Sequence, residues 1–161
     1  MRFAFKLVDE PYYRITSVHN LIHYVTHDKK THLLLDYIGS PNTDISKATE
    51  QFLYVKQHYN KMSGRQMRQF IVSFNKKCCI SSVDAYYIGM MICRFYAERY
   101  QIIFGVHQDT DNIHIHFALN TVSYVDGKKY REGYADGFEL EGYVEYCVNK
   151  YVSDLFKGVY K

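Results

Sequence analysis

The sequence contains no tryptophan, only two prolines and no apolar run long enough to span a membrane. Residues 1–6 alternate basic and apolar side chains and lack the hydrophobic stretch of a secretory signal peptide. The four cysteines do not follow the C-x₂-C spacing of a structural zinc site. These absences argue against a membrane protein, a secreted protein and a cysteine zinc module. We therefore expect a cytoplasmic protein with no membrane partner.

A large excess of charge of either sign is also missing. The formal net charge is +3 over 161 residues, which permits nucleic-acid binding without arguing for it. Hydrophobic residues make up 47% of the chain, enough for a folded core, and the length suits one domain over residues 1–161. Tyrosine is abundant instead, with 17 residues. Many will be half-buried structural residues, although such a surplus also suits stacking on unpaired bases.

The spacing of apolar residues predicts alternating strands and helices along the whole chain. Period-two alternation and short apolar runs predict strands near residues 3–7, 33–38, 69–74, 100–106 and 113–122. Spacing of three and four predicts helices near residues 16–25, 46–60, 81–95 and 139–155. Ser81 and Asp84 have the spacing of a capping box at the start of the third helix. We predict an α+β fold, with a central antiparallel sheet of about five strands and helices packed on one face.

The strand that begins at Ile113 carries polar and apolar residues on opposite faces. Because side chains alternate along a strand, His114 and His116 share one face, and the isoleucines beside them point into the core. If residues 109–112 form the loop of a hairpin, His107 lies opposite His114. Gly105 then lies opposite His116, where it leaves open space. Three imidazoles on one face with a vacant side are the ligand set of a catalytic divalent-metal site.

Two further polar residues near this hairpin are candidates for supporting the histidines. Asp109 lies two residues after His107, so its carboxylate can accept the second ring N–H of a metal-binding histidine, or it can simply cap the turn. Asn120 lies on the same strand face as His114 and His116. We expect both residues to act through the histidines rather than on the metal directly.

Three segments together resemble the motifs of a known enzyme family. Residues 107–120 resemble the three-histidine motif of plasmid conjugative relaxases, in the P-type mobilisation class of the histidine–hydrophobic–histidine endonuclease superfamily. Residues 21–31 resemble the first motif of that class, where a helix carries the nucleophilic tyrosine. Residues 70–74 resemble its second motif, a strand that ends in Ser-Phe, and residues 64–66 resemble a segment that often precedes that strand. The resemblance covers roughly residues 16–130.

This resemblance implies a palm-like relaxase fold and a set of functional residues. Tyr24 is then the nucleophile, and Ser73 contacts DNA near the cleavage point. The implied metal ligands are His107, His114 and His116, with Mg²⁺ or Mn²⁺ as the expected ion and Zn²⁺ as an alternative. Because tyrosine is so common in this chain, other nucleophiles stay open: Tyr37 first, then Tyr12 and Tyr13.

The implied activity is metal-dependent nicking and joining of single-stranded DNA at the transfer origin of a plasmid or mobile element. The tyrosine attacks a phosphodiester, and the enzyme works as a monomer, with accessory relaxosome proteins as further partners. Basic residues that could contact the DNA backbone fall in two groups: Lys56, Lys61, Arg65 and Arg68, then Lys128, Lys129 and Arg131. Among these, Arg65, Arg68, Lys128 and Lys129 are our predicted DNA contacts.

Other functional classes remain open on the sequence alone. A rolling-circle replication initiator of the same superfamily would share the histidines, but we expect its tyrosine after them, whereas Tyr24 precedes them. A zinc hydrolase would use the three histidines with a bound water and would not need Tyr24. A non-catalytic DNA-binding or partner-binding domain would carry the histidines as a relic and bind no metal.

Overall fold

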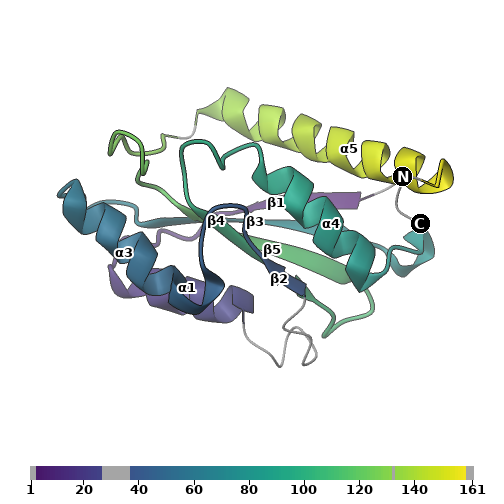
Figure 1. Cartoon of the computed structure of the whole chain (residues 1–161), viewed down its shortest axis with the longest axis horizontal. Coiled ribbons are helices and arrows are strands. Elements are labelled where there is room, and N and C mark those ends of the chain that lie inside the picture. The colour runs from purple at the N-terminus through teal and green to yellow at the C-terminus, as the bar shows by residue number, and fades with distance from the viewer. Residues whose placement is uncertain (1–2, 27–36, 132, 159–161) are drawn as a thin grey trace.

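The computed structural model describes residues 3–26, 37–131 and 133–158 (Figure 1). Its elements follow one another along the chain as β1 (Phe3–Val8), α1 (Thr16–Thr26), β2 (Ile38–Gly39), α3 (Ala48–His58), β3 (Met67–Phe74), α4 (Ser82–Cys93), β4 (Ile102–His107), β5 (Ile113–Asn120) and α5 (Tyr134–Phe156). Short 3₁₀ turns, Ile45–Lys47 and Lys76–Cys78, precede α3 and α4. The class is α+β, as the sequence predicts.

The strands form one antiparallel sheet with the order β1-β3-β5-β4-β2. The histidine-bearing strand β5 is therefore central, with β3 on one side and β4 on the other. Central position suits its sequence, because a strand flanked on both sides is shielded from water along its length. From Ile115 to Asn120, every residue of β5 is buried.

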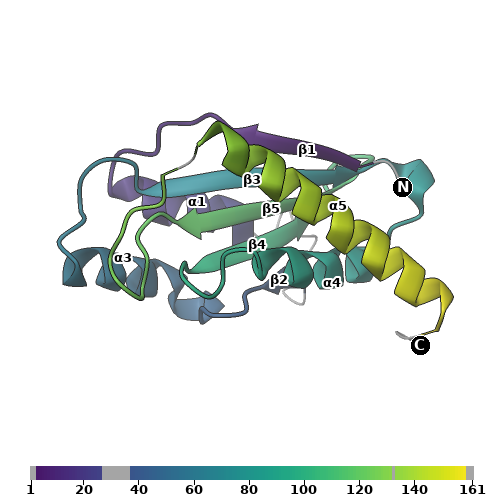
Figure 2. The ribbon, with the colours of Figure 1, turned by 90° about the horizontal axis from the view of Figure 1, so that it is seen from above.

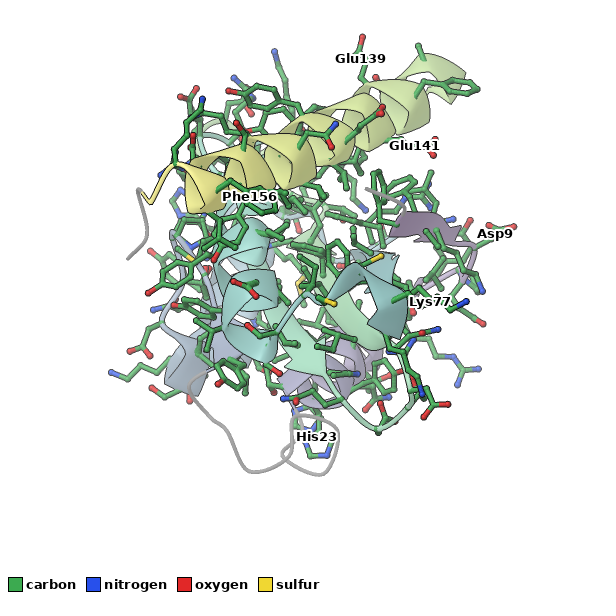
Figure 3. All side chains as sticks on the ribbon, turned by 90° about the vertical axis from the view of Figure 1, so that its right-hand side faces the viewer. Asp9, His23, Lys77, Glu139, Glu141 and Phe156 are labelled. Carbon is green, nitrogen blue, oxygen red and sulfur yellow. The ribbon has the colours of Figure 1, made fainter. Side chains whose placement is uncertain are left out.

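Helices cover both faces of this sheet, which differs from the predicted single layer (Figure 2). On one face, α4 and α5 pack against a core that includes Phe70, Phe104 and Phe117. On the other face, which also carries the histidines, α1 and α3 pack against Ile103 and Ala118. Figure 3 shows the two layers from the end, with α5 on one side and His23 of α1 on the opposite side. Ile103 and Ala118, which lie next to the histidines along the two strands, provide part of the surface on which α1 docks.

The ends of the elements agree with the sequence where capping is local. Ser81 caps α4 with the predicted capping box: its backbone N–H donates to Asp84 Oδ2 at 2.8 Å, and Asp84 N–H donates to Ser81 Oγ at 3.1 Å. Helix α5 begins at Tyr134 rather than near Glu139, because the Asp136 carboxylate accepts the N–H of Gly133 and caps an earlier turn. Of the predicted strand at 33–38, residues 33–36 lie outside the described residues. Among the described helices, none is both long and apolar enough to cross a membrane.

A buried lysine joins the helical layer to the sheet. Lys56 of α3 is fully buried, and its Nζ donates to Asn120 Oδ1 and to the Gln66 carbonyl, each at 2.6 Å. Asn120 also donates to the Phe52 carbonyl and to Gln101 Oε1. Burial, and secondarily the charge of Lys129, lower the pKa of Lys56 to about 7. Lys56 therefore lies inside the protein and not on a DNA-binding surface.

We predict a distinctive pH dependence of stability from Lys56. The unfolded chain keeps the Lys56 proton up to about pH 10, whereas the folded chain releases it near pH 7. The unfolded state thus binds more protons between these values, so stability rises with pH through this window, by up to about 1.4 kcal/mol per pH unit. Lys56→Met should remove this part of the slope in urea unfolding curves, and Lys47→Met, at an exposed position, should leave it. Equal slopes for Lys56→Met and the parent chain would contradict the burial argument.

Candidate active site

The predicted register of the histidine hairpin is confirmed. In the β4–β5 ladder, His107 pairs with His114 and Gly105 pairs with His116. The loop between the strands holds residues 108–112, which are rich in turn-forming Asp, Asn and Thr. All three histidines therefore lie on the same face of the sheet, the face covered by α1.

The three imidazole rings are not equivalent in this arrangement. The rings of His107 and His116 stack with centroids 4.1 Å apart, and both side chains are buried. The His114 ring lies 6.0 Å from that of His116 at a tilt of 51°, and it is only half-buried. His107 and His116 thus form a diagonal pair across the two strands, and His114 lies directly opposite His107.

Tyr24 packs directly on this pair of histidines. Its ring centroid lies 5.5 Å from that of His107 and 5.3 Å from that of His116, and both contacts are edge-on. Helix α1 places it there because Val18, Leu21, Ile22 and Val25 form the buried face of the helix, and Tyr24 lies beside that face. The side chain is 41% exposed, so one part of the phenol faces the histidines and another part faces solvent.

The space opposite His116 is occupied, contrary to the open space that the sequence predicts. Gly105 lies directly under the last turn of α1, and a Cβ at this position would overlap the carbonyl oxygen of Val25. That same carbonyl accepts a hydrogen bond from Nε2–H of His107 at 2.9 Å. The missing side chain at Gly105 therefore admits the backbone of α1 and brings Tyr24 to the histidines.

A chain of polar side chains reaches His116 from the opposite direction. The Gln69 amide lies 3.1 Å from Nδ1 of His116, and the hydroxyl of Tyr12 donates to Gln69 Oε1 at 2.7 Å. Tyr12 has a left-handed backbone, with φ of 42°, an uncommon conformation for a bulky residue. Burial first, then the negative charge of Glu10, raise the pKa of Tyr12 to about 12. Tyr12 is therefore a hydrogen-bonding phenol on the far side of Gln69 from the histidines.

His114 has its own local partners in the hairpin loop. Its Nδ1 lies 3.4 Å from Thr110 Oγ1, whose hydroxyl donates to the Asn112 carbonyl. Burial lowers the pKa of His114, and the carboxylate of Asp109 opposes this shift. Asp109 thus acts electrostatically on His114 from the hairpin loop. A neutral His114 is the form that can donate a ring lone pair to a metal.

The residues present fit a divalent metal by chemistry, although their rings are not gathered around one point. Within the described parts of the chain, no group of three His, Cys, Asp or Glu side chains has the arrangement of a metal site. Imidazole nitrogen is nevertheless a common ligand of divalent transition metals. Each of the three rings has one nitrogen next to a protein partner, which is the usual way that ligand histidines are oriented. His107, His114 and His116 are therefore the residues that would hold such an ion.

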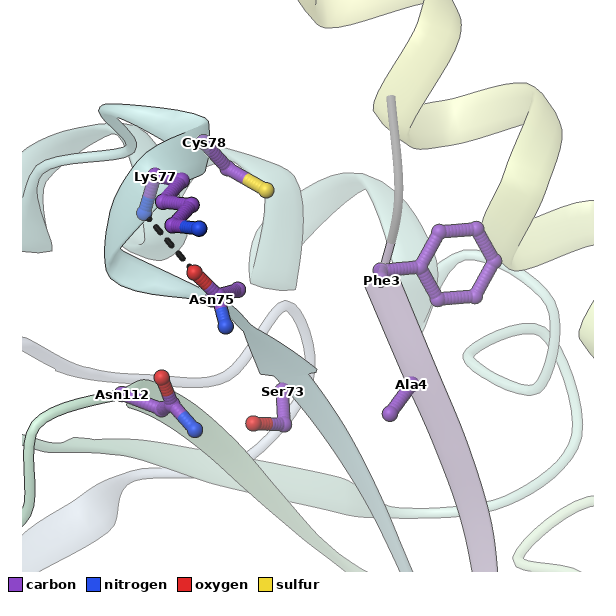
Figure 4. Close-up of a pocket in the computed structure, with 7 residues that line it drawn as sticks. All are labelled: Phe3, Ala4, Ser73, Asn75, Lys77, Cys78 and Asn112. Atoms are coloured by element: carbon purple, nitrogen blue, oxygen red, sulfur yellow. Dashed lines mark hydrogen bonds between the residues drawn. The ribbon is translucent and has the colours of Figure 1, made fainter.

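Ser73 lies next to the histidines along the sheet. It pairs with His114 in the β3–β5 ladder and shares its face. Its side chain lines a pocket of about 750 Å³, together with Asn75, Lys77 and Asn112. Figure 4 shows the Ser73 hydroxyl directed toward Asn112 and away from β1. The predicted DNA-contact serine is therefore beside the histidines, in an open pocket.

Other predicted site residues lie elsewhere. Asn120 is on the histidine face but bonds to Lys56, Phe52, Gln101 and Val122, so it supports the fold at the far end of β5. Arg68 points to the opposite face of β3, since alternation separates it from Gln69 and Ser73. Arg65, Lys128 and Lys129 gather in a separate pocket.

The alternative tyrosines are less well placed than Tyr24. Tyr37 packs on the core formed with α4 and α5, away from the face that carries the histidines. Tyr13 is exposed beside Arg65. Tyr12 reaches the histidines only through Gln69. Gln69 itself is a residue that sequence reasoning missed, although strand parity with Ser73 places this one long polar side chain on the histidine face.

Comparison with known proteins identifies the family of this chain. The MobA/VirD2-like nuclease domain of relaxases matches residues 24–152, a segment that begins at Tyr24 and includes Ser73 and all three histidines. The chain belongs to this relaxase family. The predicted resemblance to relaxases is thereby confirmed.

Two curated proteins, both called Protein rlx and both from Staphylococcus aureus, are similar to this relaxase domain. One is 28% identical over 89 residues, which is 55% of this chain and 27% of that protein. The other is 30% identical over 90 residues, which is 56% of this chain and 28% of that protein. The similarity therefore spans little more than a quarter of the length of these relatives. No solved structure gives a significant match.

We predict that Gly105→Ala disrupts the relaxase site through α1. The added methyl group would meet the Val25 carbonyl and force the last turn of α1 away from β4. Overpacking of this kind typically costs about 1–3 kcal/mol, and the His107–Val25 hydrogen bond should lengthen. Denaturant unfolding measures the first effect, and the histidine ring NMR signals report the second. Gly142→Ala is the control, because a Cβ there meets no atom within 4 Å. Equal stability of the two variants would refute the close contact.

Proposed function

We propose that this chain is a relaxase nicking domain, over residues 1–161, that cuts and rejoins single-stranded DNA at the transfer origin of a plasmid or mobile element. Tyr24 is the proposed nucleophile. The observation that carries the proposal is the packing of the Tyr24 ring on both His107 and His116, residues separated from it by more than 80 positions in the sequence. A structural tyrosine has no need of two stacked, buried histidines beneath a half-exposed phenol.

The proposed reaction is a transesterification at one phosphodiester bond. The hydroxyl oxygen of Tyr24 attacks phosphorus, and the bond from phosphorus to the 3′ oxygen breaks. The products are a 5′-phosphotyrosine on the protein and a free 3′-hydroxyl, which takes up a proton as it leaves. A phenol attacks poorly until its proton is removed, so the site must also accept that proton. Because the phosphotyrosine retains an ester bond, the 3′-hydroxyl of a strand can attack it and reverse the cut.

The three histidines are the proposed holders of a divalent cation, with Mg²⁺ or Mn²⁺ as the expected ion and Zn²⁺ as the alternative. When bound, such an ion would serve as a Lewis acid toward the non-bridging oxygens of the scissile phosphate. The chain itself orients the donor nitrogens. Donation from Nε2–H of His107 to Val25 places the lone pair of that ring on Nδ1. If Nδ1–H of His114 donates to Thr110, its lone pair is on Nε2.

Gln69 is proposed to set the ring of His116 in the same way. The oxygen and the NH₂ group of a side-chain amide occupy nearly the same space. Rotating the Gln69 amide by half a turn therefore exchanges its hydrogen-bond donor and acceptor. In that orientation Gln69 accepts from Nδ1–H of His116, and its NH₂ group donates to the Tyr12 hydroxyl, at the same positions as the observed contacts. The lone pair of His116 then lies on Nε2. Asp109 contributes its negative charge near His114.

We predict that Gln69→Leu weakens metal binding. Loss of a partner that orients a ligand histidine typically costs 10–100-fold in metal affinity, so we expect about that loss in Mn²⁺ titration calorimetry. Gln57→Leu, at an exposed position on α3, should leave the affinity as it is. If the parent chain binds no Mn²⁺, Mg²⁺ or Zn²⁺, the metal part of the proposal fails. If Gln69→Leu binds as tightly as the parent, the role of Gln69 fails alone.

We predict that Tyr24→Phe abolishes the covalent protein–DNA adduct. The experiment incubates the protein and Mn²⁺ with labelled single-stranded oligonucleotides that carry the cognate origin, and it detects the adduct on a denaturing gel. Tyr37→Phe also removes a phenol hydroxyl, but from a tyrosine that packs on the core beneath α4 and α5, so this variant should retain the adduct. An adduct that survives in Tyr24→Phe would falsify the nucleophile assignment. Cleavage without any adduct in the parent chain would favour a zinc hydrolase.

The remaining parts of the proposal concern the substrate and its surroundings. Ser73 is proposed to contact the DNA near the cleaved phosphate, since it shares the histidine face and an open pocket. Arg65, Lys128 and Lys129 are proposed backbone contacts farther away. A monomer that acts in the cytoplasm, with accessory relaxosome proteins as partners, completes the proposal. The position of Tyr24 before the histidines favours a relaxase over a rolling-circle initiator.

A further inference from the structure

Cationic side chains gather in one pocket at the end of the sheet where β3 begins. The segment between α3 and β3 and the segment after β5 approach each other there (Figure 2). The pocket contains five basic residues, Lys61, Arg65, Lys128, Lys129 and Arg131, and no aspartate or glutamate is among the described residues that line it. We call these five residues the basic pocket.

Most of the contacts that hold the basic side chains of this pocket in place are to backbone carbonyls rather than to carboxylates. Lys129 donates to the Ser63 carbonyl, and Arg65 donates to the Glu10 carbonyl at 2.6 Å. Burial first, then the charge of Lys61, lower the pKa of Lys129. Lys128 is 3.9 Å from Asp126, a carboxylate that Arg99 also binds. Crowding like charges is unfavourable, so the arrangement suits an anion that neutralises several of them at once.

The basic pocket is connected to the Tyr24 site by a short stretch of chain. Glu10 and Tyr12 line the pocket that contains Tyr24, and the Glu10 carbonyl is the one that Arg65 binds. Beside them Tyr13 is 59% exposed, with the Arg65 guanidinium carbon 5.6 Å from its ring centroid. From Met67, where β3 begins next to this pocket, to Ile71, the partner of His116, the strand rises roughly 13 Å at about 3.3 Å per residue. The two pockets therefore cannot bind the same phosphate.

We propose that the basic pocket binds the backbone of the substrate strand several nucleotides from the phosphate at Tyr24, and that Tyr13 stacks on a base between the two points. The inference rests on the proposed function and adds the extent of the substrate to it. Exposed aromatic rings stack on unpaired bases without sequence preference, and lysine and arginine supply the phosphate contacts. The relaxase domain then holds its strand at two separate points, of which only one carries out chemistry.

The test measures how salt weakens binding to thymidine oligonucleotides of graded length, without divalent metal, by fluorescence anisotropy. The variant Lys128→Gln/Lys129→Gln/Arg131→Gln removes three cations from the basic pocket. The slope of log K against log salt is negative, and each lost phosphate contact should reduce its magnitude by about 0.7. The loss of three contacts should therefore reduce the magnitude by about 2 on long oligonucleotides. On the shortest oligonucleotides that the parent chain binds, the change should be much smaller. The variant Lys47→Gln/Arg94→Gln/Lys157→Gln removes as many exposed charges outside both pockets and should not alter the slope on either length.

Several outcomes separate this inference from the proposed function. An unchanged slope on long oligonucleotides, or an equal fall on short and long ones, overturns the second binding point. A parent chain that forms the Tyr24 adduct and gives either result keeps the proposed nicking reaction, and it loses this inference together with the proposed backbone contacts of the basic pocket. Tyr13→Ala should weaken binding to long oligonucleotides with little change in slope, and circular dichroism checks that each variant is folded. Duplex DNA carries the same phosphates, so a complement annealed over the outer part of the long oligonucleotide tests whether the basic pocket accepts duplex DNA. If the difference between long and short oligonucleotides then disappears, the pocket binds single strands.

Discussion

The contact between the last turn of α1 and Gly105 of β4 determines the geometry of this relaxase site. Only a residue without a side chain lets the Val25 carbonyl reach the sheet. The carbonyl then receives Nε2–H of His107, and the neighbouring Tyr24 comes to rest on the histidine pair. One glycine thus allows the position of a helix end, the orientation of the His107 ring and the placement of Tyr24 together. The apolar face of α1, with Val18, Leu21, Ile22 and Val25, keeps the helix in place once the backbones have met.

Much of the hairpin could be predicted from sequence because its determinants are local. Strand alternation and a short polar loop are enough to pair His107 with His114 and Gly105 with His116. The capping box of α4 is local in the same sense. Parity alone does not give position along the strand, however. Asn120 shares a face with His116 but lies four residues away, roughly 13 Å at about 3.3 Å per residue, and there it bonds to Lys56.

The features that sequence reasoning missed depend on contacts between distant segments. The polar residues on the histidine face led us to expect that this face is open to solvent. In the structure, α1 and α3 cover Ile103 and Ala118 on the same face. The sequence suggests that Lys56 is a surface cation, yet its two acceptors, the Gln66 carbonyl just before β3 and Asn120 at the end of β5, meet only in the fold. Gln69 is a polar residue within a mostly apolar strand, and its meaning depends on its partners, Tyr12 and His116.

The strand order has a consequence for the order of events during synthesis. Strand β5 lies between β3 and β4 but is the last of the five described strands to leave the ribosome. Until it is made, β4 has only the two-residue strand β2 beside it, and β3 has only β1. Tyr24 is synthesised long before His116 reaches it. Under the proposed function, a growing chain has its nucleophile before it has a site, and it can cut DNA only once β5 has paired with β3 and β4.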